Sequence, residues 1–172
     1  MKPRFVIVTP VILALAVPAT MLAQAAKKEQ ITNPLVGTWR LISFRRTELA
    51  TKEVSEPLGK FPKGYINFGS DGRMMVLFVG DTRPKPKDLA TMTDQERAGL
   101  FKTMLALAGT YDTDGKTVTY HPDVSSNEIW TGTHQERIIN LDGQKLSLTT
   151  VPHPASMDGK VSVIVVTFEK VD

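Results

Sequence analysis

Arg137, in the strand-like segment THQERIINL, is the charged residue with the clearest chemical interest in this sequence. Because side chains alternate between the two faces of a strand, one face of this segment holds Gln135, Arg137, Ile139 and Leu141. Two apolar residues end that set, which predicts that the face points inward. A buried charge needs a partner, so Arg137 is expected to meet a carboxylate, backbone carbonyls or an anionic ligand group. An internal structural pair, an exposed position at a rim and an anchor for a bound acid all stay open.

Histidines are the other candidates for chemistry, and the chain has three of them, His121, His134 and His153. They lie in separate predicted strands or loops, and the one local pair is His134 with Glu136. A zinc site needs three or four ligands with supporting contacts, so we predict no metal site and no cofactor. No G-x-S-x-G, H-E-x-x-H or phosphate-loop motif is present, and the neighbours Tyr120 and His121 would face opposite ways. We therefore predict no catalytic residues.

Aromatic and sulfur-bearing side chains could line a cavity if the strands close into a barrel. Such residues pack in a core in most proteins, but the inner face of a barrel lines whatever cavity remains. The candidate ligand-binding residues are accordingly Arg137, Tyr120, Trp39, Gln135, Met74, Phe78 and Trp130.

Short strands separated by turns account for most of the chain after residue 35. Asp-Gly pairs favour hairpins because both residues tolerate positive φ, and they occur at 71–72, 114–115, 142–143 and 158–159. The predicted strands are 36–46, 64–69, 73–80, 109–113, 116–124, 132–141, 145–150 and 161–171. A regular series of this kind is typical of a sandwich or a barrel.

One helix is predicted to interrupt the strands, over about 93–108. Thr93 and Glu96 form a capping box, and Gly109 is a stop signal. Apolar residues at helical spacing extend the pattern to about four turns, and they are Leu100, Phe101, Met104, Leu105, Leu107 and Ala108. The long, proline-rich loop 81–92 that leads to this helix is the predicted lid.

The first 25 residues have the layout of a secretory signal peptide. Lys2 and Arg4 precede an apolar run over 5–17, and Ala23-Gln24-Ala25 offers a cleavage site after Ala25. We therefore expect a periplasmic or secreted protein, with a linker over 26–34 and a barrel domain over 35–172. The run is too short for a good membrane span, although an uncleaved N-terminal anchor stays open. No integral membrane span is expected after cleavage.

The charge balance and the lack of cysteine exclude several classes of protein. Loss of Lys2 and Arg4 with the signal peptide would lower the 21 basic side chains to 19, against 18 acidic ones, for a net charge of +1. No basic stripe remains to suggest a nucleic-acid partner. The absence of cysteine excludes disulfides, thiolate metal sites and a cysteine nucleophile, so the core alone must hold the domain.

The Gly-x-Trp of Gly37 and Trp39, at the start of the first predicted strand, resembles that of the lipocalin superfamily, where it lies at the closed end of an eight-stranded barrel. The chain is more closely similar to the bacterial lipocalin-like domain family, through LVGTWRLISF, PKGYINFGSDGRMMVLF, LAGTYDTDGKTVTYHPDVS and GTHQERIINLDGQKLSLTT. The resemblance implies an all-β fold, an eight-stranded antiparallel lipocalin-like barrel with one inserted helix, and a cavity.

Two departures from classical lipocalins limit what the resemblance implies. An arginine that packs over the tryptophan from near the last strand is absent, and that strand offers Lys170 instead. The helix lies between the third and fourth predicted strands rather than after the last one. The expected function is an exported binding protein that holds a small, mostly apolar ligand, lipophilic or amphipathic, in the cavity. The alternatives are a protein-interaction module with a filled barrel and a cavity enzyme that uses acid–base chemistry.

Overall fold

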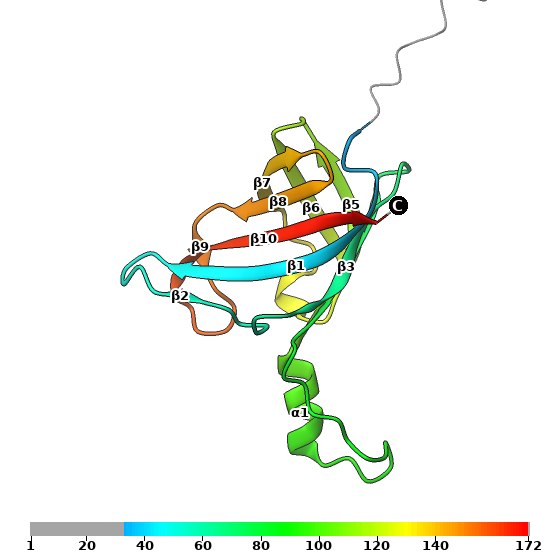
Figure 1. Cartoon of the computed structure of the whole chain (residues 1–172), viewed down its shortest axis with the longest axis vertical. Coiled ribbons are helices and arrows are strands. Elements are labelled where there is room, and N and C mark those ends of the chain that lie inside the picture. Colours follow the sequence, from blue (N-terminus) through cyan, green and yellow to red (C-terminus); the bar gives the residue numbers. More distant parts are fainter. Residues whose placement is uncertain (1–32, 172) are drawn as a thin grey trace, which may run out of the picture. The chain divides into compact units, whose positions relative to one another are not determined.

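Eight long strands close into an antiparallel barrel in the computed structural model, which describes residues 33–171 (Figure 1). They are β1 (Gly37–Glu48), β3 (Lys63–Phe68), β4 (Arg73–Val79), β5 (Met104–Thr113), β6 (Thr117–Ser125), β7 (Gln135–Asp142), β8 (Lys145–Thr150) and β10 (Val161–Val171). The barrel closes because β1 pairs with β3 on one side and with β10 on the other. Two short strands, β2 (Val54–Ser55) and β9 (His153–Pro154), extend the sheet beside β1 and β10. The predicted all-β barrel and its eight strands are confirmed, whereas the predicted signal peptide lies outside the described residues.

Alternation along each strand decides which side chains fill the barrel. In β4, Met74, Val76 and Phe78 are buried, while Met75 and Leu77 between them are exposed. The strands β3, β6 and β8 follow the same period of two, as expected for strands with one face on a core and one in solvent.

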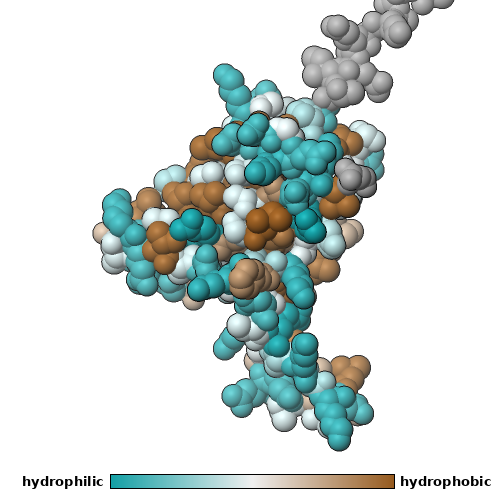
Figure 2. All heavy atoms as spheres, viewed as in Figure 1, coloured by the Kyte–Doolittle hydropathy of each residue, from teal (hydrophilic) through white to brown (hydrophobic). Residues whose placement is uncertain are grey.

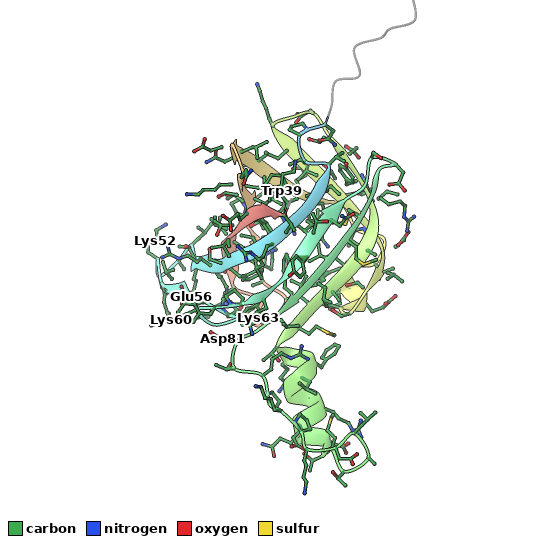
Figure 3. The ribbon with its side chains drawn as sticks, turned by 45° about the vertical axis from the view of Figure 1, so that its right-hand side comes forward. Trp39, Lys52, Glu56, Lys60, Lys63 and Asp81 are labelled. Carbon is green, nitrogen blue, oxygen red and sulfur yellow. The ribbon has the colours of Figure 1, made fainter. Side chains whose placement is uncertain are left out.

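The two ends of the barrel are built differently. Short hairpins join β3 to β4, β5 to β6 and β7 to β8 at one end, and each contains one of the predicted Asp-Gly pairs. The glycines of these turns, Gly72, Gly115 and Gly143, have positive φ. At the other end the connections are long, over 49–62, 80–103, 126–134 and 151–160. We call the end with the short hairpins the closed end and the end with the long connections the open end. Figure 3 shows Trp39 toward the closed end, with Lys63 and Asp81 near the open end.

The inserted helix is shorter than predicted. Helix α1 covers Asp94–Lys102, with the expected capping box at Thr93, and β5 begins at Met104. The prediction of helix to about residue 108 is therefore wrong. Residues 104–113 pair with β4 from Met104 opposite Val79 onward, so sheet pairing overrides the helical spacing of the apolar residues.

Helix α1 projects from the open end between β4 and β5 (Figure 1). None of its residues is buried, and mostly hydrophilic side chains cover the projecting segment on the face shown in Figure 2. No helix within residues 33–171 is long and apolar enough to cross a membrane.

Candidate ligand-binding site

A cavity of about 430 Å³ lies inside the barrel toward its open end. Ligand sites in proteins usually measure about 300–1,000 Å³, and an eight-stranded barrel can either enclose one small ligand or be filled by side chains. Here the inner side chains leave space. Its apolar wall is formed by Phe44, Ile66, Val76, Phe78, Leu105, Leu107, Leu148, Ile164, Val166 and Phe168.

Trp39 belongs to the closed end and does not line the cavity. Its side chain is fully buried, and its indole Nε1 donates a hydrogen bond of 2.8 Å to the carbonyl oxygen of Leu35. Lys170 Nζ lies 5.1 Å from the centroid of the Trp39 ring, so a lysine provides the cation over the tryptophan. A Cβ at Gly37 would meet Lys170 Cε at 3.3 Å, and Gly37 has a φ of +129°, which together explain the glycine of Gly-x-Trp.

Arg137 faces the cavity, as the alternation of β7 predicts. Its Nη2 donates to Gln135 Oε1 at 2.9 Å and its Nη1 to the Glu136 carbonyl oxygen at 2.8 Å. The guanidinium carbon lies 5.3 Å from the centroid of the Tyr120 ring. Within residues 33–171, no carboxylate forms an ion pair with Arg137.

Tyr120 places its ring in the barrel beside Arg137. Burial raises the pKa of the Tyr120 hydroxyl well above its ordinary value, so the group is a neutral hydrogen-bond donor at physiological pH. Burial also lowers the pKa of Arg137, but the guanidinium stays charged at neutral pH because arginine starts from so high a pKa. Arg137 and Tyr120 thus place a cation and a neutral hydroxyl side by side in the cavity wall.

Five of the seven candidate residues line the cavity and two do not. Arg137, Tyr120, Gln135, Phe78 and Trp130 contribute to its surface. Met74 is buried in the core beside the closed-end hairpin, as Trp39 is in β1. All of these side chains except Trp130 come from strands, and their distance from the open end decides which of them reach the cavity.

The cover of the cavity comes from a segment that sequence reasoning missed. No residue of the predicted lid, 81–92, lines the cavity, and the β8–β10 connection lines it instead. That connection contributes Val151, His153, Pro154, Ala155, Ser156 and Met157, while the 3₁₀ turn Glu128–Trp130 adds Ile129 and Trp130. The apolar residues of the segment VPHPASM (151–157) are not regularly spaced. The length of this connection is the one feature of the sequence that could have indicated a cover for the cavity.

Arg46, in β1, binds the connection between β8 and β10 through hydrogen bonds and an ion pair. The side chain is buried, and its two terminal nitrogens donate to the two carboxylate oxygens of Asp158 at 2.8 Å each. Its Nε donates to Ser162 Oγ at 2.8 Å. These bonds from Arg46 lower the pKa of Asp158 below its ordinary value. The resulting bidentate pair, which we call the latch, holds the end of the cavity-lining segment.

His121 and His134 meet on the outer face of the barrel, beside the start of β7. Their Nδ1 atoms are 2.6 Å apart, and His121 Nε2 is 2.5 Å from Asp112 Oδ2. Both ring nitrogens of His121 are therefore engaged by protein groups. Tyr120 points inward from the next position, so it shares no site with His121. Across residues 33–171, no three or more His, Asp or Glu side chains are grouped to hold a metal ion.

Comparison with known proteins agrees with the barrel fold. The chain is similar to the 4'-hydroxy-3'-methoxypropiophenone carrier protein ppsC of Aspergillus oryzae, with 30% identity over 92 residues. The match covers 49% of this chain and 82% of the carrier protein. A family model described as a lipocalin-like domain matches residues 36–171, from the first strand of the barrel to the last. The chain therefore belongs to the lipocalin-like domain family.

Proposed function

We propose that this protein is an exported carrier that holds a small, mostly apolar molecule in its barrel. The observation that carries the proposal is the cavity of about 430 Å³, whose wall is mostly apolar and includes a few polar side chains, among them Arg137, Gln135 and Tyr120. Apolar walls with a few placed polar groups are the usual design of a small-molecule site. The similarity to a protein named as a carrier supports the same class of function.

Ligand binding is tested by a substitution that fills the cavity with a larger side chain. The same substitution on the outer face of the barrel is the control. Leu105 lines the cavity, whereas Leu77, on the neighbouring strand β4, is exposed on the outer face. The protein is titrated with a fluorescent lipophilic probe, anilinonaphthalene sulfonate, and with a panel of competing lipophiles. We expect Leu105→Trp to abolish probe binding and Leu77→Trp to retain it.

Two results would contradict the carrier function. The first is probe binding that survives Leu105→Trp in a protein that remains folded by circular dichroism, since the probe would then sit outside the barrel. The second is the absence of both probe binding and any co-purifying small molecule in organic extracts of the native protein.

Export is tested on the chain in its own cell. The basic start, the apolar run and the Ala-Gln-Ala site support cleavage after Ala25. We expect to find the protein in the periplasmic or extracellular fraction, with the intact mass of a chain that begins at Ala26. A full-length mass in the cytoplasmic fraction would contradict export and leave the binding proposal standing.

A further inference from the structure

We propose that the cargo is an apolar carboxylic acid whose carboxylate is bound by Arg137 at the mouth of the cavity. The inference rests on the proposed carrier function and names the chemical class of the ligand. It is carried by a charge that the protein places in its cavity without supplying a counter-charge.

The lack of a counter-charge follows from the groups around Arg137. Glu136 is the one carboxylate among the residues that line the cavity, but it points outward from β7 and is exposed. The partners of Arg137 within residues 33–171 are an amide oxygen of Gln135 and a backbone carbonyl, which are both neutral. A guanidinium so placed attracts an anion and repels a cation, and a neutral ligand would leave its charge unpaired.

The donors of Arg137 are free to bind such an anion. A guanidinium has five N–H groups, and the two bonds to protein oxygens leave three without an acceptor among the described residues. The same two bonds hold the planar group in one orientation, which suits bidentate binding of a carboxylate. The hydroxyl of Tyr120 also has no hydrogen-bond partner within residues 33–171, and it offers a further donor beside the guanidinium.

The distribution of polarity fixes the orientation of the ligand. Arg137 and Gln135 are among the first three residues of β7, on the open-end side of that strand, whereas Ile66 and Phe168 pair with Trp39 and Leu146 and lie nearer the closed end. A molecule with an acid at one end and an apolar body can satisfy both regions at once. The carboxylate would lie at the mouth and the apolar body toward the closed end.

The test compares an acid with its neutral counterpart of equal chain length. Decanoate and decanol are titrated by calorimetry into the full chain, into Arg137→Met and into Arg45→Met, whose arginine is exposed on β1. We expect the unaltered protein and Arg45→Met to bind decanoate about 10- to 100-fold more tightly than decanol, the usual range for charge-assisted hydrogen bonds. Arg137→Met should lose that preference and keep its affinity for decanol.

Each alternative result has a distinct meaning. Equal binding of acid and alcohol by the unaltered protein overturns the acid class and leaves the carrier function intact, and this comparison needs no variant to fold. A preference for decanoate that persists in folded Arg137→Met overturns the role of Arg137. If neither compound binds and no other lipophile does, the carrier function fails together with the inference.

Discussion

Trp39 and Trp130 lie toward opposite ends of the same barrel, and their surroundings give them different roles. Trp39 is fully buried, with its indole N–H bonded to a backbone carbonyl and the Lys170 ammonium over its ring. Trp130 is partly buried and borders the cavity. The first is a structural residue of the closed end, and the second is available to a ligand.

Truncation of the two tryptophans should therefore have unequal effects on stability. We expect Trp39→Ala to lower the free energy of unfolding by about 3–5 kcal/mol, the usual cost of removing a buried large aromatic side chain. Trp130→Ala should cost much less, because part of its surface already faces the cavity. Urea denaturation of both variants measures this, and equal losses would contradict the assignment of roles.

Alternation along the strands predicts the face on which a residue lies but not its height in the barrel. It correctly turns Arg137, Gln135, Tyr120 and Phe78 inward. Trp39 and Met74 also point inward, yet they lie too near the closed end to reach the cavity. Height depends on how strands are staggered around the barrel, which is set by pairing between distant segments and leaves no local signal.

At the scale of elements, the β-strands were predictable and the end of the helix was not. The Asp-Gly turns separate strands whose alternation is clear, so all eight long strands are found near their observed positions. Residues 104–108 are apolar at every position, MLALA, which fits a helix and a buried strand equally well. The choice between the two is made by pairing with β4, a contact that the local pattern does not contain.

The projecting segment around α1 should be dispensable for the barrel. None of its helical residues is buried, and no residue from 81 to 92 lines the cavity. Asp81 accepts a hydrogen bond from the Phe61 backbone N–H, so it is kept. We expect replacement of residues 82–101 by a short Gly-Ser linker to leave the melting temperature and the ligand affinity almost unchanged. A large fall in ligand affinity would instead show that this segment acts as a lid over the cavity.

The latch between Arg46 and Asp158 should make the cover of the cavity sensitive to acid. The folded pKa of Asp158 is lowered by its bonds from Arg46, so its stabilising effect is present above the unfolded aspartate pKa of about 4. The effect is lost as the pH falls from there through the lowered folded pKa, since protonation then breaks the pair. At neutral pH, Asp158→Asn should melt at a lower temperature than the unaltered protein.

Melting curves across the acid range test the latch. The difference between Asp158→Asn and the unaltered protein should shrink as the pH falls from about 4 through the lowered folded pKa of Asp158, because the native carboxylate then becomes neutral too. Asp123→Asn is the matched control, because its pair with Arg73 is exposed on both sides and contributes little. A difference that stays constant into strong acid would show that the Asp158 charge does not matter.

For the whole molecule, the buried Trp39 and the proposed ligand site lie toward opposite ends of one barrel. Short hairpins and the buried Trp39 close one end, while long connections and the cavity occupy the other. Long connections contribute little to the core and can vary in sequence, so the open end can be adapted to a ligand without loss of the fold. A cavity in the same barrel nevertheless leaves apolar side chains without partners, and a bound ligand would supply them.

Ligand binding should accordingly stabilise the entire fold, because a ligand that binds only the native state shifts the unfolding equilibrium. At a free concentration of 100 times its Kd, a ligand adds about 2.7 kcal/mol to the free energy of unfolding. With the amphiphile that binds tightest in calorimetry, we expect a rise of roughly 5–10 °C in melting temperature by scanning calorimetry. Leu105→Trp should show no such rise, because the added indole occupies the cavity. An equal rise in that variant would mean that the amphiphile stabilises the protein from its outer surface.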